Sequence, residues 1–172
     1  MTRSLAIALA LCAAVLQGGS ANPYTSSLRQ DYGQIRDYVI RSAEKMPEEK
    51  YAFRPSPDVR TFAQQIGHIA DDQYNLCAGA KGETRKDAYM AIESSLSKKT
   101  ELVAALKKAF AYCDGAYDAL TDASGAQPPV GNRRPTKFAM LNWNLWHTWE
   151  HYGNIVVYLR LNGFVPPSSE PR

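Results

Sequence analysis

Apolar residues recur at helical spacing in four long stretches of the chain. The stretches run from about residue 26 to 44, 56 to 77, 96 to 120 and 137 to 161. Positions three, four and seven apart lie on one side of an α-helix. The third stretch has the clearest pattern, with two series of apolar residues seven apart: Leu96, Val103, Phe110 and Tyr117, and Leu106, Cys113 and Leu120. We therefore expect four long helices that pack through apolar stripes.

The segments between these stretches carry turn and capping signals. Ser56, followed by Pro57, is predicted to cap the second helix. Residues 78–86 are predicted to form a loop, followed by a short helical piece at 87–94, and residues 121–136 a second loop rich in proline and glycine. No segment alternates with the period of a strand. The sequence predicts an all-α, up-and-down four-helix bundle in a single domain, residues 22–172.

Residues 1–21 are typical of a secretory signal peptide. Arg3 precedes an apolar run from Leu5 to Leu16, and small residues end at Ala21. The apolar run is 12 residues long, whereas a membrane helix needs about 20. We expect cleavage after Ala21, export to the periplasm or beyond, and no stable membrane insertion afterwards. The alternative is an uncleaved N-terminal anchor.

The charge of the chain is mild. There are 20 Lys and Arg against 17 Asp and Glu, a formal net charge of +3. This balance does not suggest a nucleic-acid partner, which calls for a strongly basic patch.

Two cysteines, Cys77 and Cys113, lie beyond the signal peptide. If the second and third helices are antiparallel neighbours, these residues lie near opposite ends of the bundle. Twenty residues of helix span about 30 Å, but a disulfide needs Cα atoms within about 7 Å. We therefore expect two buried, unpaired thiols.

The chain has three histidines, His68, His147 and His151. His147 and His151 are four apart, so their side chains lie on one helix face. All three lie on the flanks of apolar stripes, which favours a groove between two helices. Isolated flank histidines are usually ordinary surface residues, but together these three can meet. Three neutral imidazoles with open positions suit a catalytic Zn²⁺ or another first-row divalent ion.

Three neighbouring residues are candidates for supporting roles. Asp72 follows His68 by one turn, so it is either an acceptor for a ligand histidine or a catalytic base. Glu150 lies beside His151 but points away, as a solvated surface charge does. Tyr158 shares the sector of His147 and His151, where it either lines the cleft or packs in the core.

Two segments resemble the DinB-like metal-binding four-helix bundles. They are FRPSPDVRTFAQQIGHIADDQ (residues 53–73) and HTWEHYGNIVVYLRLNGFVPPSS (residues 147–169). In that family, one histidine of the second helix and an HxxxH pair of the last helix bind a divalent metal, often Zn²⁺ or Ni²⁺. The resemblance assigns these roles to His68, His147 and His151, and is strongest to a subgroup that is often exported. Some members transfer low-molecular-weight thiols.

Two classes of function follow. The first is a metal-dependent enzyme, hydrolase-like or thiol-transferase-like, acting on a small molecule that the sequence does not identify. The alternative is a non-enzymatic periplasmic metal- or ligand-binding bundle.

Three tryptophans lie three apart on the fourth helix. Trp149 is predicted to join the core stripe, whereas Trp143 and Trp146 point elsewhere. Because this helix is apolar over more of its circumference than a surface helix needs, a homodimer is a hypothesis. A carbohydrate platform would require exposed, coplanar rings.

Overall fold

A computed structural model describes residues 22–84, 90–129 and 135–171. Within these ranges the fold is all-α, with no strand, as the sequence predicts. The predicted signal peptide, residues 1–21, lies outside them. The long helices are α1 (Pro23–Lys45), α2 (Phe62–Lys81), α4 (Lys99–Asp118) and α6 (Lys137–Leu161). The short elements are η1 (Glu48–Lys50), α3 (Ala91–Ser95), α5 (Asp122–Gly125) and η2 (Pro167–Ser169).

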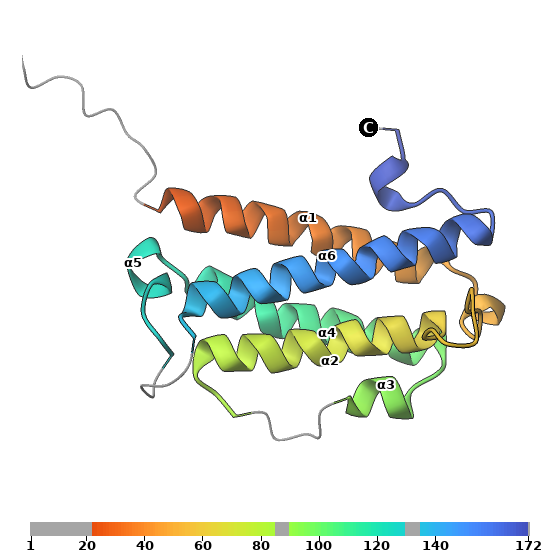
Figure 1. Cartoon of the computed structure of the whole chain (residues 1–172), viewed down its shortest axis with the longest axis horizontal. Helices are drawn as coiled ribbons and strands as arrows, with labels where there is room; N and C mark the ends of the chain where they lie inside the picture. The colour runs from red at the N-terminus through yellow and green to blue at the C-terminus, as the bar shows by residue number, and fades with distance from the viewer. Residues whose placement is uncertain (1–21, 85–89, 130–134, 172) are drawn as a thin grey trace, which may run out of the picture.

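The long helices do not alternate in direction along the chain. α1 and α6 run one way, and α2 and α4 run the other way (Figure 1). α3 lies near the start of α2, and α4, which follows α3, begins at that same end of the bundle, so α2 and α4 are parallel (Figure 1). The order is therefore up, down, down, up, rather than the strict alternation that we expected.

The parallel pairing of α2 and α4 overturns the cysteine prediction. Cys77 and Cys113 lie at the same end of the bundle, and a disulfide joins them. Their Cα atoms are 5.3 Å apart, within the usual range for a disulfide. Both residues are fully buried, as expected. The prediction of two unpaired thiols is wrong because its premise, antiparallel neighbours, is wrong.

The start and end of α2 also differ from the prediction. Thr61, not Ser56, caps the helix: its side chain accepts a hydrogen bond from the Gln64 amide, and the Gln64 side chain accepts one from the Thr61 amide. This reciprocal pair satisfies two amides that the first turn leaves without helical partners. The helix continues past Cys77 to Lys81 and ends at Gly82, which adopts the left-handed conformation with φ 76°.

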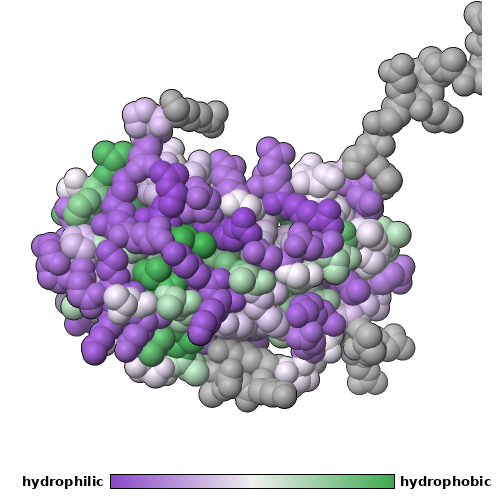
Figure 2. Space-filling view, turned by 180° about the vertical axis from the view of Figure 1, so that it is seen from behind, coloured by the Kyte–Doolittle hydropathy of each residue, from purple (hydrophilic) through white to green (hydrophobic). Residues whose placement is uncertain are grey.

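All four long helices contribute to one hydrophobic core. Its largest fully buried residues are Ile35, Met46, Tyr51, Phe62, Ile66, Ile69, Leu102, Leu106, Phe110, Tyr117, Leu141 and Ile155. Seen from behind, the molecule is mainly hydrophilic, with small hydrophobic areas in its left half (Figure 2). No helix in the described ranges has the length and apolarity needed to span a membrane.

The tryptophans of α6 lie at the surface. Trp143 is 45% exposed, Trp146 56% and Trp149 36%. The prediction that Trp149 joins the core is therefore wrong; its ring packs edge-on against Tyr38 and Tyr152 at the margin of the core.

Candidate metal centre

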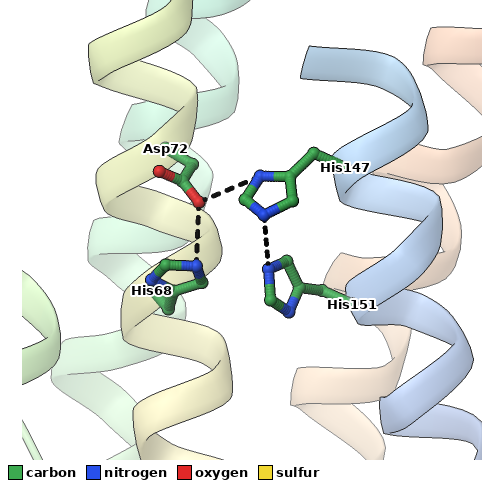
Figure 3. Close-up of side chains that lie close together, drawn as sticks. All are labelled: His68, Asp72, His147 and His151. Atoms are coloured by element: carbon green, nitrogen blue, oxygen red, sulfur yellow. Dashed lines mark hydrogen bonds and ion pairs between the residues drawn. The ribbon is translucent and has the colours of Figure 1, made fainter. Parts of the chain in front are cut away.

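Two antiparallel helices bring four potential metal ligands together. His68 and Asp72 come from α2, one turn apart, and His147 and His151 come from α6, also one turn apart (Figure 3). One donor atom from each residue lies within 4.8 Å of the others. The structure thus brings together all three predicted histidines, and adds Asp72 to the same cluster.

Asp72 connects the two helices within this cluster. Its Oδ2 lies 3.0 Å from Nε2 of His68 and 3.2 Å from Nδ1 of His147. The other ring nitrogen of His147, Nε2, lies 2.9 Å from Nε2 of His151. The four side chains therefore form a continuous chain of polar contacts across the interface between α2 and α6 (Figure 3).

The cluster is more buried than its position on the flanks of the apolar stripes suggested. His68, Asp72 and His151 are each 5% exposed. The side chain of His147 is 21% exposed, and the Trp146 ring contacts its imidazole with centroids 5.8 Å apart. Solvent therefore reaches the cluster mainly on the side of His147.

Burial and mutual contact shift the protonation of the cluster. Burial raises the pKa of Asp72, but hydrogen bonds from His147 and His68 outweigh it and hold that pKa well below its usual range. Burial also works against the charged form of His68, yet its hydrogen bond to Asp72 and the charge of Asp72 raise the pKa of His68 overall.

His151 shifts in the opposite direction. Burial, followed by the charges of His147 and His68, lowers the pKa of His151 to about 3. Its buried Nδ1 makes no hydrogen bond within the described part of the chain, so a proton there gains no partner. An anionic carboxylate and a neutral imidazole are the forms in which these groups bind metals. Three imidazoles and a carboxylate suit Zn²⁺ or Ni²⁺, so the residues present fit a divalent transition metal.

Glu93, which the sequence analysis did not single out, orients His68 from outside the cluster. Its Oε2 lies 3.0 Å from Nδ1 of His68, and its Oε1 accepts a hydrogen bond of 2.8 Å from Nε of Arg60. A carboxylate on the far nitrogen of a ligand histidine fixes the ring and its tautomer. Glu93 belongs to α3, 25 residues from His68, in a polar segment whose pattern gives no sign of this contact.

α3 is held against α2 by two further features. The Asp71 carboxylate accepts hydrogen bonds from the amides of Ile92 and Glu93, at 3.0 and 2.9 Å. The backbone of α3 also approaches Gly67 so closely that a Cβ at that position would lie 2.7 Å from the Glu93 Cα. Gly67 and Asp71, each one residue before a member of the cluster, therefore place the carboxylate that orients His68.

A buried polar network fixes α2 against α6 on the other side of the cluster. The Gln73 amide donates to Thr148 at 2.9 Å, and its oxygen accepts from Asn144 at 3.0 Å. Tyr117 of α4 donates to the same Asn144 side chain. Gln73 is fully buried, and its side chain contributes hydrogen bonds as well as packing.

The two remaining candidates have different roles. Glu150 is exposed and is not part of the cluster, as predicted. Tyr158 is buried, packs edge-on against Phe53, and donates a hydrogen bond to the backbone oxygen of Arg60. Tyr158 thus packs in the core, lines the neighbouring cavity and fixes the segment that carries Arg60.

The fold and the cluster define an all-α bundle with a candidate metal centre between two antiparallel helices. The chain belongs to the DinB superfamily, whose family model matches residues 32–155.

Solved structures share this fold at low sequence identity. A DinB-like protein from Bacillus cereus superposes with a TM-score of 0.68 at 14% identity, over 83% of this chain and 95% of that one. A DinB-like protein from Bacillus subtilis gives a TM-score of 0.64 at 17% identity, over 85% of this chain and 99% of that one. No curated protein matches the sequence significantly.

Proposed function

We propose that this protein is an exported, divalent-metal-binding member of the DinB superfamily. In this proposal, His68, His147 and His151 hold Zn²⁺ or Ni²⁺, and the site catalyses a hydrolase- or transferase-type reaction on a small molecule. The observation that carries the proposal is the convergence of four donor atoms within 4.8 Å between α2 and α6. Its catalytic part draws support from the exposure of His147, which leaves one side of the site open to a substrate.

In this proposal, Asp72 and Glu93 have separate roles at the site. Asp72 holds His147 through its Nδ1, which leaves Nε2 of that ring for the ion, and as an anionic carboxylate it can also accept a proton from a substrate or from water. Glu93 fixes the ring of His68 from behind. A bound ion in such a site acts as a Lewis acid or lowers the pKa of a bound water towards about 7.

Export is supported by two independent features. Residues 1–21 have the pattern of a signal peptide. The Cys77–Cys113 disulfide is typical of proteins from oxidising compartments and rare in the cytosol of mesophiles.

Metal analysis of purified variants tests the proposal. The unmodified protein should bind about one equivalent of Zn²⁺ or Ni²⁺, and His147→Ala should lose most of it. Glu150→Ala is the matched control, because Glu150 lies on the same helix, is exposed and stands outside the cluster. Unchanged metal content in His147→Ala would rule out the proposed ligands.

The catalytic part needs a second experiment. The metal-loaded protein is assayed against ester, amide and thiol-adduct substrates, with His147→Ala as the blank. Turnover that depends on His147 supports an enzyme. If metal binds but none of these classes is turned over, the non-enzymatic binding protein becomes the better description.

A further inference from the structure

A cavity of about 550 Å³ lies beside the candidate metal centre. Its volume is within the range of about 300–1,000 Å³ that small-molecule sites occupy. Arg60 and Gln65 line it from the side of α2, Glu93 from α3, and Asn154 and Val157 from α6. The cavity therefore lies between the same elements that build the metal centre.

The sequence positions of its lining residues place the cavity one helical turn from the histidines. Gln65 precedes His68 by three residues, and Asn154 follows His151 by three residues. Because α2 and α6 are antiparallel, both steps lead towards the same end of the bundle. Three residues of helix advance by about 4.5 Å, so the cavity lies about one helical turn from the metal centre, at the end of His68 and His151. Its lining residues Arg60 and Glu93 both contact the ring of His68.

The uncommitted polar groups of the cavity suit a carboxylate. Arg60 uses Nε for Glu93 and directs one Nη to Nδ1 of His68, 3.4 Å away. Its other Nη makes no hydrogen bond to the described residues. The exposed side chain of Asn154, which also has no partner within those ranges, adds an amide donor. A guanidinium and an amide together match the geometry and charge of a carboxylate.

The remaining lining residues limit the ligand further. Val59 and Val157 are 43% and 50% exposed, and both line the cavity, so an aliphatic group can cover them. Asp58 and Glu93 also line it, and Arg60 already pairs with Glu93. Two carboxylates thus face the single guanidinium of Arg60, and this excess of negative charge opposes a dianion such as phosphate more strongly than a monoanion.

We propose that this cavity binds small monoanionic carboxylates with an aliphatic chain. The carboxylate contacts Arg60 and Asn154, and the chain covers Val59 and Val157. Resting on the proposed function, this assigns aliphatic carboxylates as the substrate class of the metal centre, with the cavity holding the part of the substrate that does not react.

Isothermal titration calorimetry of the full chain tests the proposal with three probes: hexanoate, the neutral hexanamide and inorganic phosphate. Each is titrated into zinc-loaded and metal-free protein. Hexanoate should bind at least tenfold more tightly than either other probe. Its affinity should survive removal of the metal, because the groups that hold it are not metal ligands.

Variants test the lining of the cavity. Because Arg60 also pairs with the Glu93 that orients His68, Arg60→Gln is compared with the unmodified protein in the metal-free state as well, where it should weaken hexanoate binding at least tenfold. Val157→Asp, at an exposed position, should also weaken it at least fivefold by adding a negative charge at the rim, without changing the metal content. The matched control is Leu161→Asp, one turn further along α6, 60% exposed and not part of the cavity lining; it should leave the affinity unchanged.

Three outcomes would overturn the proposal. Equal affinities for hexanoate and hexanamide would show that the carboxylate is not recognised. Hexanoate binding that disappears with the metal and ignores Arg60→Gln would place the carboxylate on the metal ion itself. Tighter binding of phosphate would contradict the assigned charge. Metal content, measured separately, reports on the metal centre alone, so a failure of that site is distinguished from a failure of the cavity.

Discussion

Replacing Gly67 by alanine should disturb the metal centre although Gly67 is not a ligand. A Cβ at this position would lie 2.7 Å from the Glu93 Cα and 3.0 Å from its amide nitrogen, and both contacts are to backbone. Ordinary contact begins at 3.4 Å. α3 must therefore move away from α2 by about 0.7 Å, because no flexible side chain can yield instead.

This displacement acts directly on the contact between Glu93 and His68. A carboxylate oxygen that lies 3.0 Å from Nδ1 of His68 would move to about 3.7 Å, too far for a hydrogen bond. Overpacking should cost about 1–3 kcal/mol of stability. Loss of the contact that orients a ligand histidine should weaken metal binding about 10- to 100-fold.

Urea denaturation and a competitive zinc titration measure the two effects of Gly67→Ala. Gly33→Ala is the matched control, because Gly33 lies inside α1 and nothing approaches its Cβ position within 4 Å. This control should gain about 0.5–1 kcal/mol of stability through higher helix propensity and bind zinc normally. If Gly67→Ala were as stable as Gly33→Ala, the close packing of α3 on α2 would be wrong.

A double-mutant cycle tests whether the effect on zinc passes through Glu93. Glu93→Gln alone should also weaken zinc binding, because the His68 ring loses the anionic partner of its Nδ1. If the explanation is right, adding Gly67→Ala to Glu93→Gln should weaken zinc binding little further. Fully additive effects on zinc affinity would refute the proposed route through Glu93.

Three further predictions follow from other features. Thiol titration of the unfolded, unreduced protein should find Cys77 and Cys113 blocked. Reduction of the disulfide should lower the free energy of unfolding, measured by urea denaturation, by about 4 kcal/mol, because the two cysteines are 36 residues apart. The pKa of His151, about 3 in the metal-free protein, lies below the ordinary 6.5, so its contribution to stability is full above pH 6.5 and falls on acidification. Between pH 7 and 5 the metal-free protein should lose about 2 kcal/mol through this group, and His151→Gln should remove that part of the loss. If Trp143 and Trp146 form a homodimer contact, light scattering should show a dimer, and a charged substitution at Trp146 should convert it to a monomer. A monomeric unmodified protein would contradict the dimer.

The periodicity of apolar residues was sufficient to predict the four long helices, and the i, i+4 pair on the last helix led to the histidines. Periodicity carries no information on helix direction, however. Residues 82–98 can extend to about 55 Å, enough to return the chain to either end of a helix of about 30 Å. The disulfide between Cys77 and Cys113 could not be predicted without that direction.

The contacts that orient His68 could not be predicted from the sequence, for a different reason. Glu93 and Asp71 act through contacts between α2 and α3, and acidic residues in polar segments usually face solvent. Only the packing of α3 at Gly67 gives them their roles. Asp71 lies next to Asp72 in the sequence, but its partners, two backbone amides of α3, have no signature in the sequence.

The described part of the bundle has two potential cross-links, and both involve α2. The disulfide attaches α2 to α4, and a metal ion held by His68 and His147 would attach α2 to α6. Neither joins α1, which is held by packing and by polar contacts such as the pair of Arg36 with Asp114. Local opening in the oxidised, metal-loaded protein should therefore begin with α1. Amide hydrogen exchange of α1 should be the fastest among the long helices, and the other three should open as one cooperative unit.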